Sequence, residues 1–367
     1  MLLYNAALPV AQKSVYAPGD VIEWALSFPG QAIVLNSVRV SGTLSANIPS
    51  PGDVRYDSRI GVGGFFNQWA VTTARQGTIE NRAYAPRWAA MQRASLTAPG
   101  DLITSCRLTP ELTAPSDPAT TAILARGGVV AAGRVTGAIE FSAVVPCCLN
   151  TAASGDGGPP LLDYGRTGDV RVSCRLNTPV EALYGPGFDG ATSFTISDLR
   201  LEYSTAPGGI PASQTVTLST TVDVKQVINS SNAQISVSLP IAAVGVSCSF
   251  MRVADELTPA AANTMLMRPP GITRVVFSFS DQTSGVLGFP LDTPEDILEM
   301  YLDSFGSALQ KHSFTTEQLS AGNVFGVGLP FPSAGALASM VGINIESAIT
   351  AADQYYIYAF YRGAITI

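Results

Sequence analysis

The residue types that most often carry catalysis are scarce in this chain. His312 is its only histidine, so the sequence cannot supply a Ser-His-Asp triad or a multi-histidine metal site. It follows a predicted helix, where a histidine is usually solvated or stabilised by the helix dipole. Asp296 and Glu299 resemble a carboxylate pair, but near the start of that helix they complement its dipole instead. The sequence therefore predicts no catalytic residue and no enzyme.

The cysteines and glycines do not form a cofactor motif either. The cysteine count is odd and the spacing irregular, which argues against a disulfide framework or a metal site and predicts reduced core cysteines: Cys106, Cys147, Cys148, Cys174 and Cys248. The run Gly61-Val62-Gly63-Gly64 precedes Phe65-Phe66, whereas a phosphate loop needs Lys, Ser or Thr there. We expect no metal and no bound cofactor.

Composition excludes some partners and favours others. The 367 residues include 21 Lys+Arg and 28 Asp+Glu, for a net charge of −7. Lysine occurs only at Lys13, Lys225 and Lys311, so the chain has no cationic cluster for direct nucleic-acid binding. Charged residues are 13% and hydrophobic residues 46%, about half the usual charge content. This predicts large subunit interfaces; a GC-rich genome that favours Ala, Gly and Pro is the other explanation.

Targeting and membrane signals are weak. Met1–Val10 is apolar, but no positive charge precedes it, so we expect no signal peptide. The longest uncharged run, between Glu317 and Glu346, contains prolines and glycines and makes a poor membrane helix.

The stretch Asp57–Met91 organises the first half of the chain. It predicts a glycine-rich turn, an apolar strand, a polar turn at Gln76-Gly77, and a short helical segment. The residues that carry this pattern are Gly61, Gly63, Gly64, Phe65, Phe66, Trp69, Val71, Ile79, Glu80, Asn81, Tyr84, Trp88 and Met91. None looks catalytic, so the stretch is expected to be structural.

Alternating apolar and polar residues predict strands along most of the chain. The expected strands are Val21–Phe28, Val38–Leu44, Ala138–Val145, Val170–Leu176, Phe194–Tyr203, Thr215–Val227, Ile235–Leu239, Val244–Phe250, Val275–Phe279 and Tyr355–Tyr361. In Phe194–Tyr203 the apolar phase switches, which predicts a β-bulge near Ser197-Asp198. Tyr355–Tyr361 is apolar on both faces and is expected to be an inner strand.

Helices are few. Thr293–Leu309 has an N-cap at Thr293, Pro294 at the first position and a four-residue apolar repeat, so we expect it to be the longest helix. A second helix is predicted at Asp255–Met267, and a short one at Ala119–Arg126 within an irregular excursion.

Many short strands with few helices indicate β-sandwiches. The Pro/Gly-rich segment Ser204–Ser213 is the predicted linker. It gives two domains, residues 1–208 with an N-terminal arm and residues 209–367. We predict an all-β chain with two tandem eight-stranded jelly rolls, a double jelly roll, and short helical excursions. Met1–Lys13 is expected to be a detachable arm without a core partner.

Both halves also resemble a known family. Asp57–Met91 is similar to the first jelly-roll region of the double jelly-roll major capsid proteins of tailless icosahedral viruses, the tectivirus- and adenovirus-like lineage. There, too, a glycine-rich entry and an aromatic strand lead to an Ile-Glu turn and a Tyr-containing helix. The second half resembles them at Pro270-Gly271-Ile272, Phe289-Pro290-Leu291, Tyr301 and Phe325–Gly328. The loops of this chain are short, so it resembles the bacteriophage members more than the large eukaryotic members, which carry long tower insertions.

The resemblance implies a structural role in the virion. It implies a homotrimer whose six jelly rolls form a pseudo-hexagonal capsomer that tiles an icosahedral shell. The implied partners are other capsomers, penton or minor capsid proteins, and an internal membrane met by the N-terminal arm, with assembly in the host-cell cytoplasm.

The alternative is a jelly-roll carbohydrate-binding or adhesin protein. Its one candidate loop is Gly185–Gly190, GPGFDG, for which a plain turn is the simpler interpretation. A glycosidase would need two facing carboxylates, which the sequence does not place.

Overall fold

The computed structural model describes residues 2–47, 53–56, 60–96, 128–131, 139–153, 160–185, 187–208, 215–229, 232–238, 242–256, 272–279, 287–289, 294–305, 326–331, 340–347, 349 and 354–367. The chain forms two compact units. Unit 1 comprises residues 1–89, 103–220 and 365–367; unit 2 comprises residues 90–102 and 221–364. The predicted boundary between residues 208 and 209 stays a prediction.

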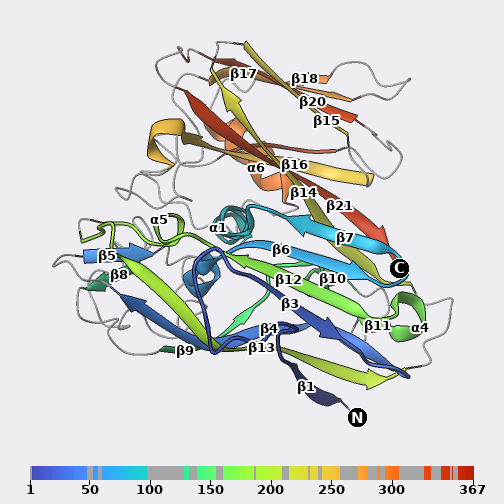
Figure 1. The fold of residues 1–367 in the computed structure, drawn as a ribbon. Helices are drawn as coiled ribbons and strands as arrows, with labels where there is room; N and C mark the ends of the chain where they lie inside the picture. The colour runs from blue at the N-terminus through green and yellow to red at the C-terminus, as the bar shows by residue number, and fades with distance from the viewer. Residues whose placement is uncertain are drawn as a thin grey trace. The chain divides into compact units, whose positions relative to one another are not determined.

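Unit 1 contains two antiparallel layers of strands (Figure 1). One layer has the order β1(Leu3–Ala7), β13(Ser193–Pro207), β4(Gln31–Asn47), β11(Leu161–Asp163), with β2(Val15–Tyr16) on β13 and β9(Ile139–Val144) on β4. The other has the order β3(Val21–Leu26), β12(Val170–Leu176), β6(Phe66–Thr73), β7(Gly77–Arg82). Smaller elements are β5(Asp53–Tyr56), β8(Gly128–Ala131), β10(Ala152–Ala153), η2(Cys148–Asn150), α4(Tyr164–Thr167) and α5(Pro179–Ala182).

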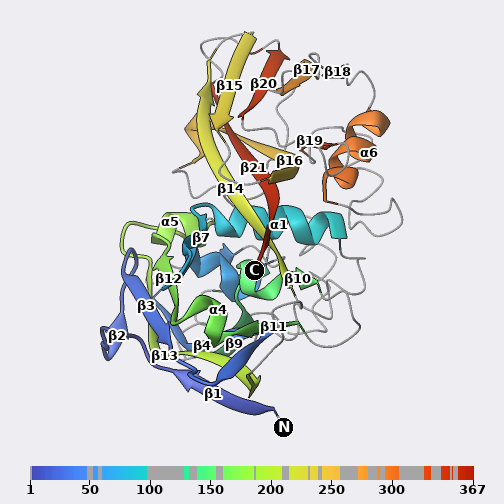
Figure 2. The same cartoon turned by 90° about the vertical axis from the view of Figure 1, so that its right-hand side faces the viewer.

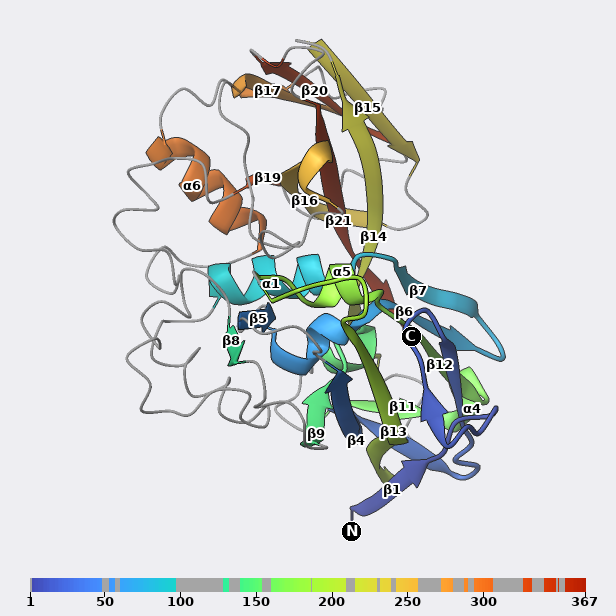
Figure 3. The same ribbon diagram turned by 60° about the vertical axis from the view of Figure 1, so that its left-hand side comes forward.

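The core of unit 1 lies between these layers (Figure 3). Phe66 of β6 meets Phe141 of β9 with ring centroids 6.2 Å apart, and Phe65 meets Phe194 of β13 at 4.9 Å. β12 shows why these sequences form strands, because its alternate residues are all buried: Val170, Val172, Cys174 and Leu176. A period of two places one set of side chains in the core and the other outside.

The predicted order within the organising stretch is confirmed where it is described. η1(Gly61–Phe65) leads into β6 and β7, and α1(Ala85–Leu96) follows. Trp88 and Met91 of α1 are buried. The stretch is therefore a structural part of the core, as the pattern predicted.

The predicted bulge in β13 is also confirmed. The pairing with β4 shifts between Ser197 and Arg200, and Asp198 has a positive φ of 53°. Gly42 lies opposite, where a Cβ would come within 3.0 Å of the Ser197 carbonyl oxygen. The extra residue lets both Ile196 and Leu199 face the core.

Two expectations about loops need correction. The first residues of the predicted linker, Ser204–Pro207, form the end of β13. Thr205 is buried there and its hydroxyl accepts a hydrogen bond from the Asn5 side chain at 2.9 Å. Pairing with β1 and β4 on both sides outweighs the local turn signals. Residues 209–214 of the linker lie outside the described residues. The N-terminal arm is not detached here, because β1 pairs with β13 from Leu3↔Thr205 to Ala7↔Leu201.

Unit 2 also contains two layers of strands (Figure 2). One has the order β15(Asn232–Ser238), β20(Met340–Ser347), β17(Ile272–Phe279), β18(Leu287–Phe289). The other has the order β19(Val327–Pro330), β16(Ala242–Arg252), β21(Tyr355–Thr366), β14(Thr217–Ile228). β21 is an inner strand, as its two apolar faces predicted. η3(Val253–Asp255) follows β16; residues 257–267 of the helix expected there lie outside the described residues, as does Ala119–Arg126.

The expectation that Thr293–Leu309 is the longest helix is wrong. α6(Pro294–Ser304) has 11 residues and α1 has 12. Around its end the Ser304 hydroxyl donates to the Tyr301 carbonyl at 2.5 Å, and the Phe305 N–H donates to the Leu302 carbonyl in a tighter turn. The α-helical hydrogen-bond pattern therefore stops at Ser304.

Candidate interaction surface

Among the residues named above, those whose side chains the structure describes do not form a reaction centre; the side chain of Asp296 is not among them. Glu299 is exposed on α6, and His312 lies outside the described residues. In the described part of the chain, no three His, Cys, Asp or Glu side chains are grouped so that they could hold a metal. Cys147, Cys148, Cys174 and Cys248 are buried and free, while Cys106 is not described. Burial raises the pKa of the Cys147 thiol to about 12, so this thiol stays protonated and unreactive at neutral pH.

The candidate sugar-binding loop is a turn in the structure. Phe188 is partly buried against the core, so it is not a free stacking platform. The Asp189 carboxylate accepts hydrogen bonds from the Ala191 N–H at 2.9 Å and the Thr192 hydroxyl at 3.2 Å. Both residues of this loop that sugars would use therefore serve the local fold.

A buried ion pair in unit 1 was not expected from the sequence. Glu80 accepts from the Arg82 guanidinium at 2.5 Å and from the Cys148 N–H at 2.6 Å. Arg82 also donates to the Pro146 carbonyl at 2.5 Å and lies over the Trp88 ring, 5.6 Å from its centroid. These contacts join β7, α1, η2 and the segment before η2. The pair thus fastens the core; it is not open to a ligand, because both side chains are almost completely buried.

The feature that points outward is the N-terminal segment. Large exposed hydrophobic side chains in the described residues concentrate there: Leu2, Leu3, Tyr4, Leu8, Val10, Val15 and Val21, against Val144, Val227 and Val244 elsewhere. We name the first five of these residues, Leu2, Leu3, Tyr4, Leu8 and Val10, the N-terminal apolar strip. Concentrated exposed apolar area marks interaction surfaces. The sequence signal was present, since the first charged residue is Lys13.

The strip is held on unit 1 by polar contacts. On the face of β1 that carries Tyr4 and Ala6, the partners are Ser204 and Glu202 of β13. Partial desolvation, together with a hydrogen bond and the charge of Glu202, raises the pKa of Tyr4 to about 12. Tyr4 is nevertheless 68% exposed, so most of its ring area remains available for contact.

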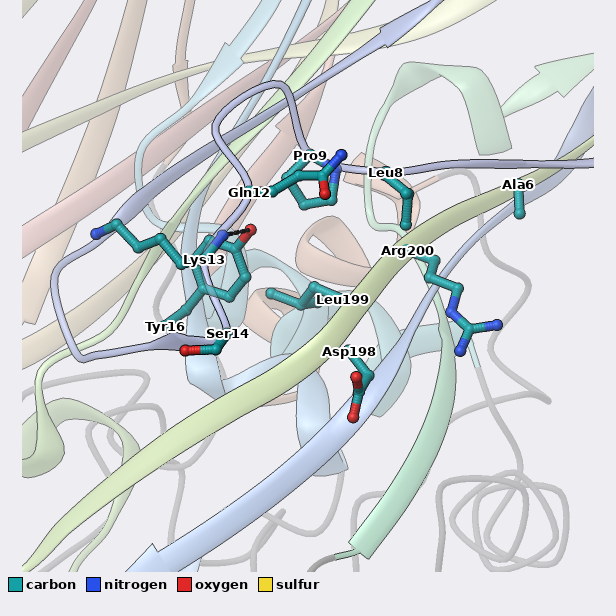
Figure 4. Close-up of a pocket in the computed structure, with 10 residues that line it drawn as sticks. All are labelled: Ala6, Leu8, Pro9, Gln12, Lys13, Ser14, Tyr16, Asp198, Leu199 and Arg200. Atoms are coloured by element: carbon teal, nitrogen blue, oxygen red, sulfur yellow. Dashed lines mark hydrogen bonds between the residues drawn. The ribbon is translucent and has the colours of Figure 1, made fainter.

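After β1 the chain arches over the bulge of β13 and returns at β2 (Figure 4). The Val10 N–H donates to the Glu23 carbonyl at 2.7 Å. The Tyr16 hydroxyl donates to the Ala11 carbonyl at 3.1 Å and accepts from the Lys13 N–H at 3.2 Å. Lys13 pairs with Asp20 at 2.9 Å. The arch is therefore a built loop rather than a loose tail.

A half-open cavity of about 410 Å³ lies beneath this arch. It is lined by Ala6, Leu8, Pro9, Gln12, Lys13, Ser14, Tyr16, Asp198, Leu199 and Arg200. Of its charged groups, Lys13 is paired with Asp20, and Asp198 accepts from the Ser197 hydroxyl at 3.2 Å. The cavity extends the strip with further apolar wall from Ala6, Pro9 and Leu199.

No protein-family model and no curated protein matches this sequence. Solved structures do match its fold. A chain of the Sputnik virophage structure determined by cryo-EM aligns with a TM-score of 0.58 and 11% identity over 100% of this chain and 86% of its own length. The Faustovirus major capsid protein aligns with a TM-score of 0.54 and 9% identity over 100% and 90%. The mavirus major capsid protein aligns with a TM-score of 0.51 and 10% identity over 98% and 86%.

These alignments span essentially the whole chain, so they concern both halves rather than one shared domain. The chain has the double jelly-roll fold, and the predicted β-dominated fold class is confirmed. Within the described residues, no helix combines the length and the apolar character that crossing a bilayer requires.

Proposed function

We propose that this chain is the major capsid protein of an icosahedral virus, a structural protein of the virion and not an enzyme. The observation that carries the proposal is the full-length double jelly-roll fold, which the Faustovirus and mavirus major capsid proteins share over 100% and 98% of this chain. Fold alone does not define function. The surface chemistry supports the proposal, because the described residues offer an exposed apolar strip suited to subunit contact.

The proposed assembly is a homotrimer. Two similar β-sandwich units in one chain give six around a three-fold axis, and a near-hexagonal block tiles a surface. The low charge content of 13% supports extensive subunit contact. Closed three-fold symmetry buries that surface without an open end for filaments.

Further partners belong to the same proposal. Capsomers would contact one another and penton or minor capsid proteins, and an internal membrane would lie beneath the shell. Assembly would take place in the host-cell cytoplasm. The charge of −7, with only three lysines, supports a shell that does not bind nucleic acid directly.

Electron microscopy of the purified full chain tests the proposal. Trimeric particles with a pseudo-hexagonal outline, and sheets or closed shells at high concentration, are the expected result. A chain that remains monomeric and forms no lattice under any assembly condition would remove the capsid assignment.

A further inference from the structure

β1 has an open edge. Its one side pairs with β13, and among the described residues it ends the order of its layer. An edge strand presents unpaired backbone N–H and C=O groups, and natural proteins usually protect such edges with charges or proline. From Leu2 to Leu8 this chain has neither. The backbone N–H and C=O groups on this edge can therefore pair with those of another strand.

Side chains around this edge favour a protein partner. Tyr4 is 68% exposed, Leu2 62% and Val10 63%. The cavity beside Leu8 adds a recess whose lining combines apolar wall from Ala6, Pro9 and Leu199 with polar and charged residues of the arch and the bulge. Backbone pairing and apolar burial are therefore available at the same place, the combination used in strand addition.

The chemistry of the edge also separates the candidate occupants. Nucleic acid is disfavoured, because residues 2–12 contain no cation. Lipid is disfavoured, because unpaired backbone groups are costly in hydrocarbon and residues 2–10 contain no Lys or Arg to hold anionic headgroups. Two cations, Lys13 and Arg200, line the adjoining cavity, and Lys13 is paired with Asp20. A strand of equal length, uncharged and apolar, satisfies both the backbone and the side chains. β1 of a second copy is such a strand.

We propose that β1 pairs antiparallel with β1 of a second copy across a two-fold axis. Such a contact is self-complementary, because each strip meets the same strip and each cavity faces side chains of the other copy. The placement of the two copies in neighbouring capsomers rests on the proposed function; the pairing of the two strands does not. It adds to the shell a defined contact between capsomers.

Cysteine cross-linking tests the pairing directly. Ala6 is exposed on β1, and a strand paired with its own copy brings β1 positions within disulfide distance. Ala6→Cys and Asn5→Cys in the full chain are oxidised mildly and run on a non-reducing gel. A cross-linked pair of chains is expected from at least one of the two variants. Val227→Cys, at an exposed position of β14, is the control and should remain uncross-linked, as should the unmodified chain.

A charge test provides the second measurement. Leu3→Lys combined with Ala6→Lys places like charges on both strands of the contact. Sedimentation should show association between capsomers weakened at least about tenfold, with the capsomer itself intact. The control Val227→Lys should associate like the unmodified chain.

If no β1 cysteine cross-links and the double lysine variant associates normally, the strand pairing is overturned. Flotation of the unmodified chain with phosphatidylcholine–phosphatidylglycerol vesicles, lost in the lysine variant without any change in association, would overturn it in favour of lipid. A chain that is monomeric with or without the substitutions would instead contradict the proposed trimer, and the cross-linking result would then still decide the β1 contact.

Discussion

At the scale of single residues, three side chains in unit 1, Asp198 and the pair Glu80 and Arg82, show how local chemistry supports the layers. Asp198 adopts φ 53° at the bulge, a conformation that few non-glycine residues tolerate and that Asp enters more easily than most. Glu80 and Arg82 place an ion pair where almost no solvent reaches. The role of each residue depends on its place in the fold and could not be predicted from the residues next to it in the sequence.

The effect of substituting Asp198 on the free energy of unfolding should depend on the backbone conformation that the new residue tolerates, and not on its charge. Asp198→Val places a β-branched residue at positive φ and should reduce the free energy of unfolding by about 1–3 kcal/mol. Asp198→Gly adopts the same φ freely and should change it by less than about 1 kcal/mol. Urea denaturation of both variants measures the difference. Equal losses would mean that the carboxylate, not the backbone, supports the bulge.

Removing the Glu80 side chain should strongly destabilise the fold, because the buried positive charge of Arg82 would lose the carboxylate that pairs with it. Glu80→Ala should cost about 3–5 kcal/mol of the free energy of unfolding. The matched control is Glu23→Ala, which breaks an Arg171–Glu23 pair at 2.9 Å whose side chains are 64% and 40% exposed. Exposed pairs contribute about 0–1 kcal/mol. Similar losses for the two variants would show that burial does not govern the Glu80 interaction.

At the scale of elements, helix α6 and strand β1 follow opposite rules. α6 is anchored by the buried ring of Tyr301 and by Phe305, the residue directly after the helix, whose rings make an edge-to-face contact at 5.2 Å. β1 is held mainly by its backbone ladder to β13, and most of its side chains are exposed. Loss of a side chain should therefore harm the helix, while loss of the whole strand should leave the core of unit 1 standing.

The packing of α6 is tested by Phe305→Ala. Emptying a core aromatic site usually costs about 3–5 kcal/mol, and we expect that loss in chemical denaturation. A loss below about 1 kcal/mol would place Phe305 outside the core of unit 2.

Deletion of residues 1–13 tests the N-terminal segment as an element. The segment contributes an edge strand and the Lys13–Asp20 pair, so the shortened chain should still fold and form its trimer. Shell assembly should be impaired, because the N-terminal apolar strip is gone. Size exclusion with electron microscopy measures both results, and a deletion that unfolds the chain would place the segment among the core contacts.

At the scale of the whole molecule, the prediction is a stable trimer. Light scattering after size exclusion should find one species of about 115 kDa, three times the chain mass of 38.3 kDa. It should persist at nanomolar concentration, because an obligate interface of at least about 2,000 Å² is expected. A monomer or dimer that persists across dilution would contradict the capsomer.

The sequence by itself determined the local features of this protein. Apolar alternation predicted β12, the phase switch predicted the bulge at Ser197-Asp198, and the two apolar faces of Tyr355–Tyr361 predicted an inner strand. Each feature could be predicted because successive side chains of a strand point to opposite faces, so the order of apolar and polar residues along the strand indicates which face is buried. The shortage of histidine and the scattered cysteines likewise gave no reason to expect a reaction centre.

Only the tertiary structure decided which distant segments meet. Ser204–Pro207 carries turn signals yet forms strand, since β1 and β4 pair on its two sides. The sequence around Glu80 and Arg82 indicates no partner for either residue, yet in the fold the Cys148 N–H donates to Glu80 and Arg82 donates to the Pro146 carbonyl. Leu3 and Tyr4 looked like part of a free arm until β13 supplied their backbone partners. Strand pairing and burial depend on residues about 65 to 200 positions away in these cases, and no local pattern encodes such partners.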